Sequence, residues 1–270
     1  MKRTKSLLWV TLWIALAAAF ATIIYFWMGK NSALEFTTGY LVELSLSVDN
    51  LFVFLLIFRY FQVPAQYQRK VLFWGLVGAL VMRAVFIVAG VALLRKFEWI
   101  AYLFGVLLVY SGIRLMRGHE SVNLENNAAL RLLRRVLPVT DSYRENKFVV
   151  RDPRWSATPL FVALIAVEVT DLIFATDSIP AILAITLNTF IVYTSNAFAI
   201  LGLRSMYFAL SDLLDAFEYL HYGLATILIF IGGKMLLGHF YGIPVVITLA
   251  AVGGILAVSM IASVALRPAE

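Results

Sequence analysis

Apolar stretches of about 20 residues recur along the whole 270-residue chain, and they constrain its fold more than any other feature. A helix of that length crosses about 30 Å of hydrocarbon while bonding its own backbone polar groups. The chain is 62% hydrophobic and 14% charged, with a mean hydropathy of +0.88, unlike a soluble domain of this size. We therefore predict an all-α polytopic membrane protein with about eight transmembrane helices. They are expected near residues 7–28, 36–58, 70–94, 98–116, 158–186, 190–210, 218–238 and 242–265.

The first apolar stretch admits two interpretations, because Lys2, Arg3 and Lys5 precede it as they would a signal peptide. Its apolar run continues through Trp27 and Met28, which is longer than the core of a cleaved signal. An uncleaved transmembrane helix is the interpretation we adopt.

The distribution of basic residues predicts the orientation. Nine Lys and Arg residues fall between 114 and 154, and three more precede residue 6. Cytoplasmic loops carry the excess of Lys and Arg, so both termini and the 117–157 loop are expected in the cytoplasm. The net charge of +6 thus reflects topology, and no nucleic-acid partner is expected. The loop itself has two interpretations, an anchor on the inner leaflet or a regulatory element.

Two parts of the chain resemble each other. The stretch ELSLSVDNLFV (43–53) aligns with DLIFATDSIPA (171–181), and FEWIAY (97–102) aligns with FEYLHY (217–222). Single residues match in the same order, namely Arg83 with Arg204, Gly112 with Gly232, and Arg114 with Lys234. Spans two to four therefore repeat as spans five to seven.

Each repeat holds three spans, an odd number, so the second copy enters the membrane from the opposite side. Inverted-topology repeats of this kind are common among secondary transporters, which bind substrate near the midplane where the repeats meet. We predict a single membrane domain over residues 1–270. Its parts are an N-terminal helix (1–33), a first repeat (34–116), a basic loop (117–157), a second repeat (158–240) and a C-terminal helix (241–270).

The repeated stretches carry carboxylates inside apolar spans, where each charge costs about 2.5 kcal/mol or more. Glu168 and Asp171 are three residues apart and share one helix face. Glu43 and Asp49 are six apart, as are Asp171 and Asp177, which on a straight helix is roughly 120° and ~9 Å. An unwound or kinked segment would let both members of a pair face one point, and Pro180 favours a kink.

These carboxylates belong to a set of ligands that contains only oxygen. Hard divalent cations such as Mn²⁺, Mg²⁺ and Ca²⁺ suit such ligands. The candidate metal ligands are Glu43, Asp49, Asn50, Glu168, Asp171, Asp177 and Ser178. Supporting or gating roles are expected for Arg83, Arg204, Asn196 and Ser47, the two arginines as counter-ions. Since the chain has no cysteine, thiolate metal ligands and thiol redox chemistry are excluded.

The stretches VELSLSVDNLFVFLLIF, EVTDLIFATDSIPAILAIT and TSNAFAILGLRSMYFAL resemble the TerC family of integral membrane proteins, particularly its Alx-like branch. The resemblance runs from about residue 35 to 245. It implies a bacterial inner-membrane protein of metal homeostasis that exports manganese. It also places the family's acidic residues on the candidate ligands named above.

Two functions from different classes follow. The first is export of a divalent cation, Mn²⁺ with Ca²⁺ or Mg²⁺ as alternatives, by alternating access driven by protons or by the metal gradient. The second is a membrane-embedded assembly or metal-loading partner whose acidic residues are structural. An enzyme is not expected, because the chain contains no H-E-x-x-H segment or nucleophile arrangement. No organic cofactor is expected either, and the partners would be the ion, protons and the bilayer.

Overall fold

The computed structural model describes residues 2–117, 139–140, 143–144, 146–151, 155–210, 220–238 and 243–265. Side chains at 2–10, 48–49, 52, 203–210, 220 and 264–265 lie outside the description too. Most of the predicted 117–157 loop, and the side chains of Asp49 and Arg204, therefore lie outside the described residues.

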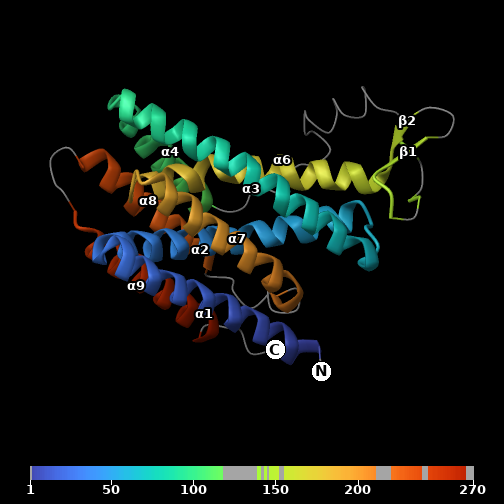
Figure 1. Cartoon of the computed structure of the whole chain (residues 1–270), viewed down its shortest axis with the longest axis horizontal. Helices are drawn as coiled ribbons and strands as arrows, with labels where there is room; N and C mark the ends of the chain where they lie inside the picture. The colour runs from blue at the N-terminus through green and yellow to red at the C-terminus, as the bar shows by residue number, and fades with distance from the viewer. Residues whose placement is uncertain are drawn as a thin grey trace. The chain divides into compact units, whose positions relative to one another are not determined.

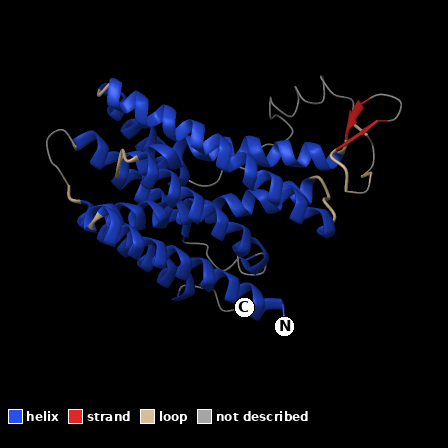
Figure 2. Ribbon diagram, in the orientation of Figure 1, coloured by secondary structure: helices blue, strands red, loops and turns tan. Residues whose placement is uncertain are grey.

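The described chain is almost entirely helical, as predicted (Figure 1). The helices are α1 (Lys2–Met28), α2 (Lys30–Tyr60), α3 (Ala65–Lys96), α4 (Trp99–Met116), α6 (Pro159–Leu183), α7 (Thr189–Leu210), α8 (Leu220–Leu237) and α9 (Val245–Ala265). Each of the eight predicted spans overlaps one of these helices, and that all eight cross the membrane stays a prediction. The described chain also contains a small antiparallel hairpin of two strands, β1 (Val149–Arg151) and β2 (Trp155–Ala157) (Figure 2). Val150 pairs with Ser156. We did not predict this hairpin.

Five of the helices are long and apolar enough to cross a membrane, namely α1, α3, α4, α6 and α9. The described parts of α7 and α8 are apolar but shorter, and α2 carries Glu35, Glu43 and Asp49 along its length. Large apolar side chains on α1, α3 and α9 face outward, among them Phe26, Val85 and Ile261. An apolar exterior over apolar helices is what lipid requires, so the chain is an integral membrane protein.

The acidic stretches are helical throughout. Helix α2 runs without interruption through residues 43–50, and α6 runs through Pro180 to Leu183. The expected unwound segment is therefore wrong for the backbone. Hydroxyl side chains bond back along the helix, with Ser45 donating to the carbonyl of Leu41 (2.6 Å) and Thr170 to that of Ala166 (2.8 Å). Such bonds satisfy a polar side chain without opening the helix.

The chain forms two compact units, and α2, α3 and α6 each contribute one part to each unit. Unit 1 consists of Met1–Asp49, Arg83–His119 and Ala175–Glu270. Unit 2 consists of Asn50–Met82 and Glu120–Phe174.

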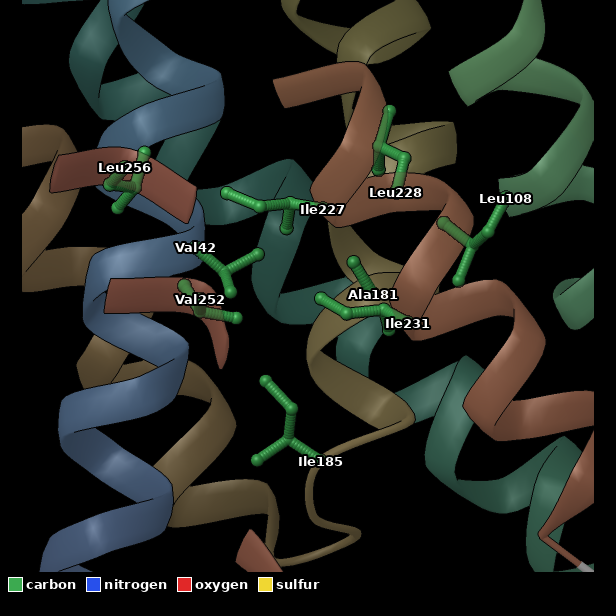
Figure 3. Close-up of a cluster of buried hydrophobic side chains, with 9 residues drawn as sticks. All are labelled: Val42, Leu108, Ala181, Ile185, Ile227, Leu228, Ile231, Val252 and Leu256. Atoms are coloured by element: carbon green, nitrogen blue, oxygen red, sulfur yellow. The ribbon is translucent and has the colours of Figure 1, made fainter. Parts of the chain in front are cut away.

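Unit 1 has several apolar core clusters, and in it α4 packs along α8, α8 on α9, and α1 on α7. Figure 3 shows one of these clusters, where side chains from five helices meet. Its members are Val42, Leu108, Ala181, Ile185, Ile227, Leu228, Ile231, Val252 and Leu256. Aliphatic side chains of this size fill space densely in few rotamers, which holds the polar residues of the unit in place.

Glycine allows α4 and α8 to approach very closely. A Cβ atom on Gly232 would lie 2.7 Å from the carbonyl oxygen of Gly105 and 2.9 Å from a methyl group of Val109. A Cβ atom on Gly112 would lie 2.7 Å from the carbonyl oxygen of Ala225 and 2.7 Å from Ile229. Small residues at such positions let helix backbones come together in a membrane. Gly105 lies near Gly232, whereas Gly112, further along α4, lies near Ala225, which is earlier in α8. The two helices are therefore antiparallel.

In unit 1, local signals explain where helices end and begin. Gly29 alone separates α1 from α2, and its φ of +90° is a conformation that suits glycine. Asn188 precedes α7, and its side-chain oxygen accepts from the backbone N–H of Phe190 (3.1 Å). This is an N-cap, which satisfies a donor that the helix leaves open.

The close approach of α4 and α8 predicts a position-specific effect of alanine. Gly232→Ala should lower the stability of the purified protein by about 1–3 kcal/mol, because the new methyl group meets backbone that cannot move aside. Gly233→Ala is the matched control, since a Cβ atom there would find no atom within 4 Å. Thermal unfolding in detergent measures both variants. Equal melting temperatures would contradict the packing described above.

Candidate functional site

Arg83 on α3 is the centre of a buried polar network in unit 1. Its side chain is 1% exposed, and its Nη1 atom donates to Asn196 Oδ1 of α7 (2.6 Å) and contacts Ser178 Oγ of α6 (3.3 Å). The same nitrogen forms a salt bridge with Glu43 Oε1 of α2. Four helices thus meet at one guanidinium group, which is the residue best suited to several simultaneous oxygen partners.

Glu43 is fully buried and only partly satisfied. Its Oε1 atom forms the salt bridge with Arg83 and also accepts a hydrogen bond from the hydroxyl of Ser47, one helical turn away (3.2 Å). Its Oε2 atom is buried and has no hydrogen-bond partner among the described residues. A buried carboxylate oxygen without a partner is costly, which marks this position for a ligand or a second state.

Asp177 has different neighbours, although it adjoins Ser178 on α6. The hydroxyl of Ser111 on α4 donates to Asp177 Oδ1 (2.7 Å), and Arg114 lies close enough to interact with it electrostatically. Both partners belong to unit 1 and lie one turn apart on α4. Asp177 therefore faces α4, whereas Ser178 belongs to the Arg83 network.

Unit 2 holds a pair of acidic residues, Glu168 and Asp171 of α6. They interact electrostatically, as their three-residue spacing predicts. Asp171 is 6% exposed, and Glu168 Oε2 is buried with no hydrogen-bond partner in the described chain. The Glu168 carboxylate lies against the backbone of α3 at Gly78, where a Cβ atom would be 2.0 Å from Oε1. Two neighbouring carboxylates in such surroundings repel each other.

The structure brings together five of the predicted residues, namely Glu43, Ser47, Arg83, Ser178 and Asn196, in the Arg83 network. Asn50 is buried in unit 2 at 3% exposure. Among the described side chains, no three Asp, Glu, His or Cys residues are grouped as a metal site. Asp49, a central predicted ligand, is not one of those side chains, so the predicted ligand set stays a prediction.

Three residues with a place in these arrangements were not assigned a role from sequence. Ser111 donates to Asp177, Arg114 interacts with it electrostatically, and Gly78 makes room for Glu168. A basic residue inside an apolar span was the available signal for Arg114, as was its match to Lys234. The Lys234 ammonium group donates to Thr248 on α9 (3.0 Å) and interacts electrostatically with Glu35, all within unit 1.

Apolar helices with lipid-compatible exteriors and charged residues held between them define a polytopic helical membrane protein. The family model of the integral membrane protein TerC family matches residues 28–270. The chain belongs to the TerC family, and the resemblance seen in its acidic motifs is confirmed.

Relatives are similar over nearly the whole chain. The Escherichia coli K12 protein named "Putative membrane-bound redox modulator Alx" is 47% identical, over 95% of this chain and 82% of that protein. A membrane protein of Myxococcus xanthus is 45% identical, over 97% of this chain and 83% of its own length. A membrane protein of Rickettsia bellii is 41% identical, over 98% of this chain and 88% of its own length. No solved structure matches the chain.

The Arg83 network predicts strong coupling between its two charged members. Glu43→Gln or Arg83→Gln alone should lower stability by about 3–5 kcal/mol in metal-free buffer, because each strands one buried charge. The double variant should recover much of that loss, since two neutral side chains remain. Chemical denaturation of the purified protein gives the coupling free energy.

Arg95→Gln is the control for this cycle, because Arg95 is an exposed arginine on the same helix. It should change stability little. Additive effects of the two single substitutions would show that Glu43 and Arg83 do not depend on each other.

Proposed function

We propose that this protein exports a divalent metal cation, Mn²⁺ in the first place, through carboxylates held inside its membrane helices. The observation that carries the proposal is Glu168, whose buried Oε2 lacks a hydrogen-bond partner among the described residues while its neighbour Asp171 carries the same charge. Two acids side by side raise each other's affinity for a cation. A carrier can use such a pair to hold a cation that comes and goes.

The chemistry of the acidic positions supports a hard cation. Glu43, Glu168, Asp171 and Asp177 offer carboxylate oxygens, and nearby Ser and Asn side chains offer neutral ones. Oxygen ligands of this kind suit Mn²⁺, Mg²⁺ and Ca²⁺ rather than softer ions. The resemblance of the acidic motifs to manganese exporters favours Mn²⁺ among the three.

The contacts between α4 and α8 support the predicted inverted repeat. The repeat alignment matches Gly112 with Gly232, and at the same spacing Gly105 with Ala225 and Val109 with Ile229. Gly112 contacts Ala225 and Ile229, while Gly232 contacts Gly105 and Val109. Each contact therefore has its counterpart under the alignment. Such reciprocity between antiparallel helices fits a two-fold axis across them, which in eight spanning helices lies in the membrane plane.

An inverted repeat of this kind suits alternating access, in which the two halves open a central site to one side and then the other. Protons are attractive as the coupling ion, because a carboxylate pair that loses its cation can take up a proton. Positive-inside counting predicts the orientation of this exporter, with both termini and the 117–157 loop in the cytoplasm of a bacterium and the helices in its inner membrane.

A scaffold or metal-loading partner is the second candidate, and the salt bridge between Arg83 and Glu43 favours it. A scaffold needs neutral pairs, and this pair is neutral. Glu168 and Asp171 are the residues that separate the two functions, since two like charges side by side repel each other and favour a bound cation. Redox modulation, which the name of the Escherichia coli relative mentions, cannot use thiols in this chain because it has no cysteine.

Charge deletion tests the export function. Glu168→Gln and Asp177→Asn keep the volume and hydrogen-bonding capacity of each side chain, and Ser111 can still donate to an amide oxygen at 177. Each should reduce Mn²⁺ uptake into everted vesicles by about tenfold or more, because a metal site loses at least that much when its ligand shell is damaged. The amount of protein in the membrane should stay normal.

Glu98→Gln serves as the control, since Glu98 is an exposed acid at the start of α4. Its uptake should match that of the wild type. Normal uptake in both acidic variants, or loss of the protein from the membrane, would contradict the carrier and support the scaffold.

Gly78 offers a test that leaves every ligand in place. Gly78→Ala should displace the Glu168 carboxylate, which is the flexible end of its side chain, and so reduce uptake with little loss of stability. Gly75→Ala is the matched control one turn earlier, because its Cβ atom would meet a methyl group of Val167 at 3.1 Å and no carboxylate. Uptake should separate the two variants while their thermal stabilities stay close. Equal uptake would remove the argument that the position of Glu168 matters.

A further inference from the structure

Three oxygen atoms from three helices converge on one nitrogen atom inside unit 1. Glu43 Oε1, Asn196 Oδ1 and Ser178 Oγ all contact Arg83 Nη1, the last two at 2.6 and 3.3 Å. We call Glu43, Ser178 and Asn196 the oxygen cage. Every member is at most 3% exposed, so the cage is a built and buried site rather than a surface contact.

The cage offers more acceptors than the nitrogen can serve. A guanidinium Nη atom carries two N–H groups, so it can direct good hydrogen bonds at two oxygens and not at three. A metal ion has no such limit, because its attraction is not confined to two directions, and hard cations bind several oxygens at once. The arrangement of acceptors therefore fits a cation better than it fits the group that occupies it.

A second observation also indicates a ligand. Glu43 is fully buried, yet its Oε2 atom has no hydrogen-bond partner in the described part of the chain. A carboxylate in contact with a divalent cation can use both oxygens. Arg83 uses one of them and leaves the other open.

We propose that the oxygen cage is a divalent-cation site which Arg83 occupies as a tethered counter-cation, and that Arg83 must withdraw before the cage binds metal. The inference rests on the proposed export function, which it extends by naming a gate. With Arg83 in place, its charge offsets that of Glu43 and its nitrogen occupies the position between the oxygens, so a second cation is not attracted there. With Arg83 withdrawn, one carboxylate and two neutral oxygens are exposed to the ion. The Arg83 side chain and the substrate cation thus occupy the oxygen cage in turn.

Binding of Mn²⁺ to the purified full-length protein tests the proposal, by equilibrium dialysis with radioactive Mn²⁺. Arg83→Gln should bind Mn²⁺ about tenfold or more tightly than the wild type, because a like charge has left the site. Adding Glu43→Gln to Arg83→Gln should abolish the gain. An Arg83→Gln variant that binds no better than the wild type would overturn the proposal, as would a gain that survives Glu43→Gln.

Stability gives a second measurement for the case in which Arg83→Gln accumulates poorly. Mn²⁺ in the growth medium and buffers should restore its abundance and raise its melting temperature more than that of the wild type, because the ion replaces the missing charge. Arg95→Gln, the exposed control on α3, should gain nothing. If Arg83→Gln is rescued by Glu43→Gln but never by Mn²⁺, Arg83 is structural only and the proposal is wrong.

The two proposals fail in different ways. Absence of Mn²⁺ uptake by wild-type vesicles would end the export function and leave the binding gain of Arg83→Gln to be judged separately. Uptake by the wild type that depends on Glu168, together with no binding gain in Arg83→Gln, would keep the export function and remove only the gate.

Discussion

A positive charge buried among apolar helices is the constraint on which unit 1 depends. Arg83 keeps its proton, and inside a membrane protein its charge is costly unless oxygen atoms surround it. Those oxygens come from α2, α6 and α7, so the registers of four helices are tied to one group. Van der Waals packing alone specifies register weakly between apolar helices, because lipid tails compete on equal terms with Leu and Ile.

The acidic residues divide into two kinds, and the division bears on function. Glu43 and Asp177 each lie beside a basic side chain, Arg83 and Arg114 respectively. Glu168 lies beside another acid, with its carboxylate against the backbone at Gly78. Charges of opposite sign side by side stabilise the resting state, whereas two acids side by side raise each other's affinity for a proton or a cation. A carrier needs both kinds, since it must be stable both empty and loaded.

Glycines set the distance between helices in both units, with different consequences. At α4 and α8, Gly112 and Gly232 bring two backbones together, so added atoms there meet groups that cannot move. At Gly78 the neighbour is a carboxylate on a flexible side chain, so added atoms would displace that carboxylate and leave the helix packing unchanged. The same residue type therefore serves packing in one place and the position of a charge in another.

The sequence by itself determined the helices, because lipid forces apolar segments of this length into helix. It also determined the class of membrane protein and the family, because the acidic motifs can be read directly from the sequence. It also singled out Glu43, Arg83, Ser178 and Asn196 as polar residues in apolar spans. Only the tertiary structure decided their partners: Ser178 joins Arg83 whereas the adjacent Asp177 joins Ser111 and Arg114. One residue along a helix rotates a side chain by about 100°, so the choice depends on which neighbour stands there. The expected unwinding of α2 and α6 is absent from the backbone, where hydroxyl groups bond back along uninterrupted helix.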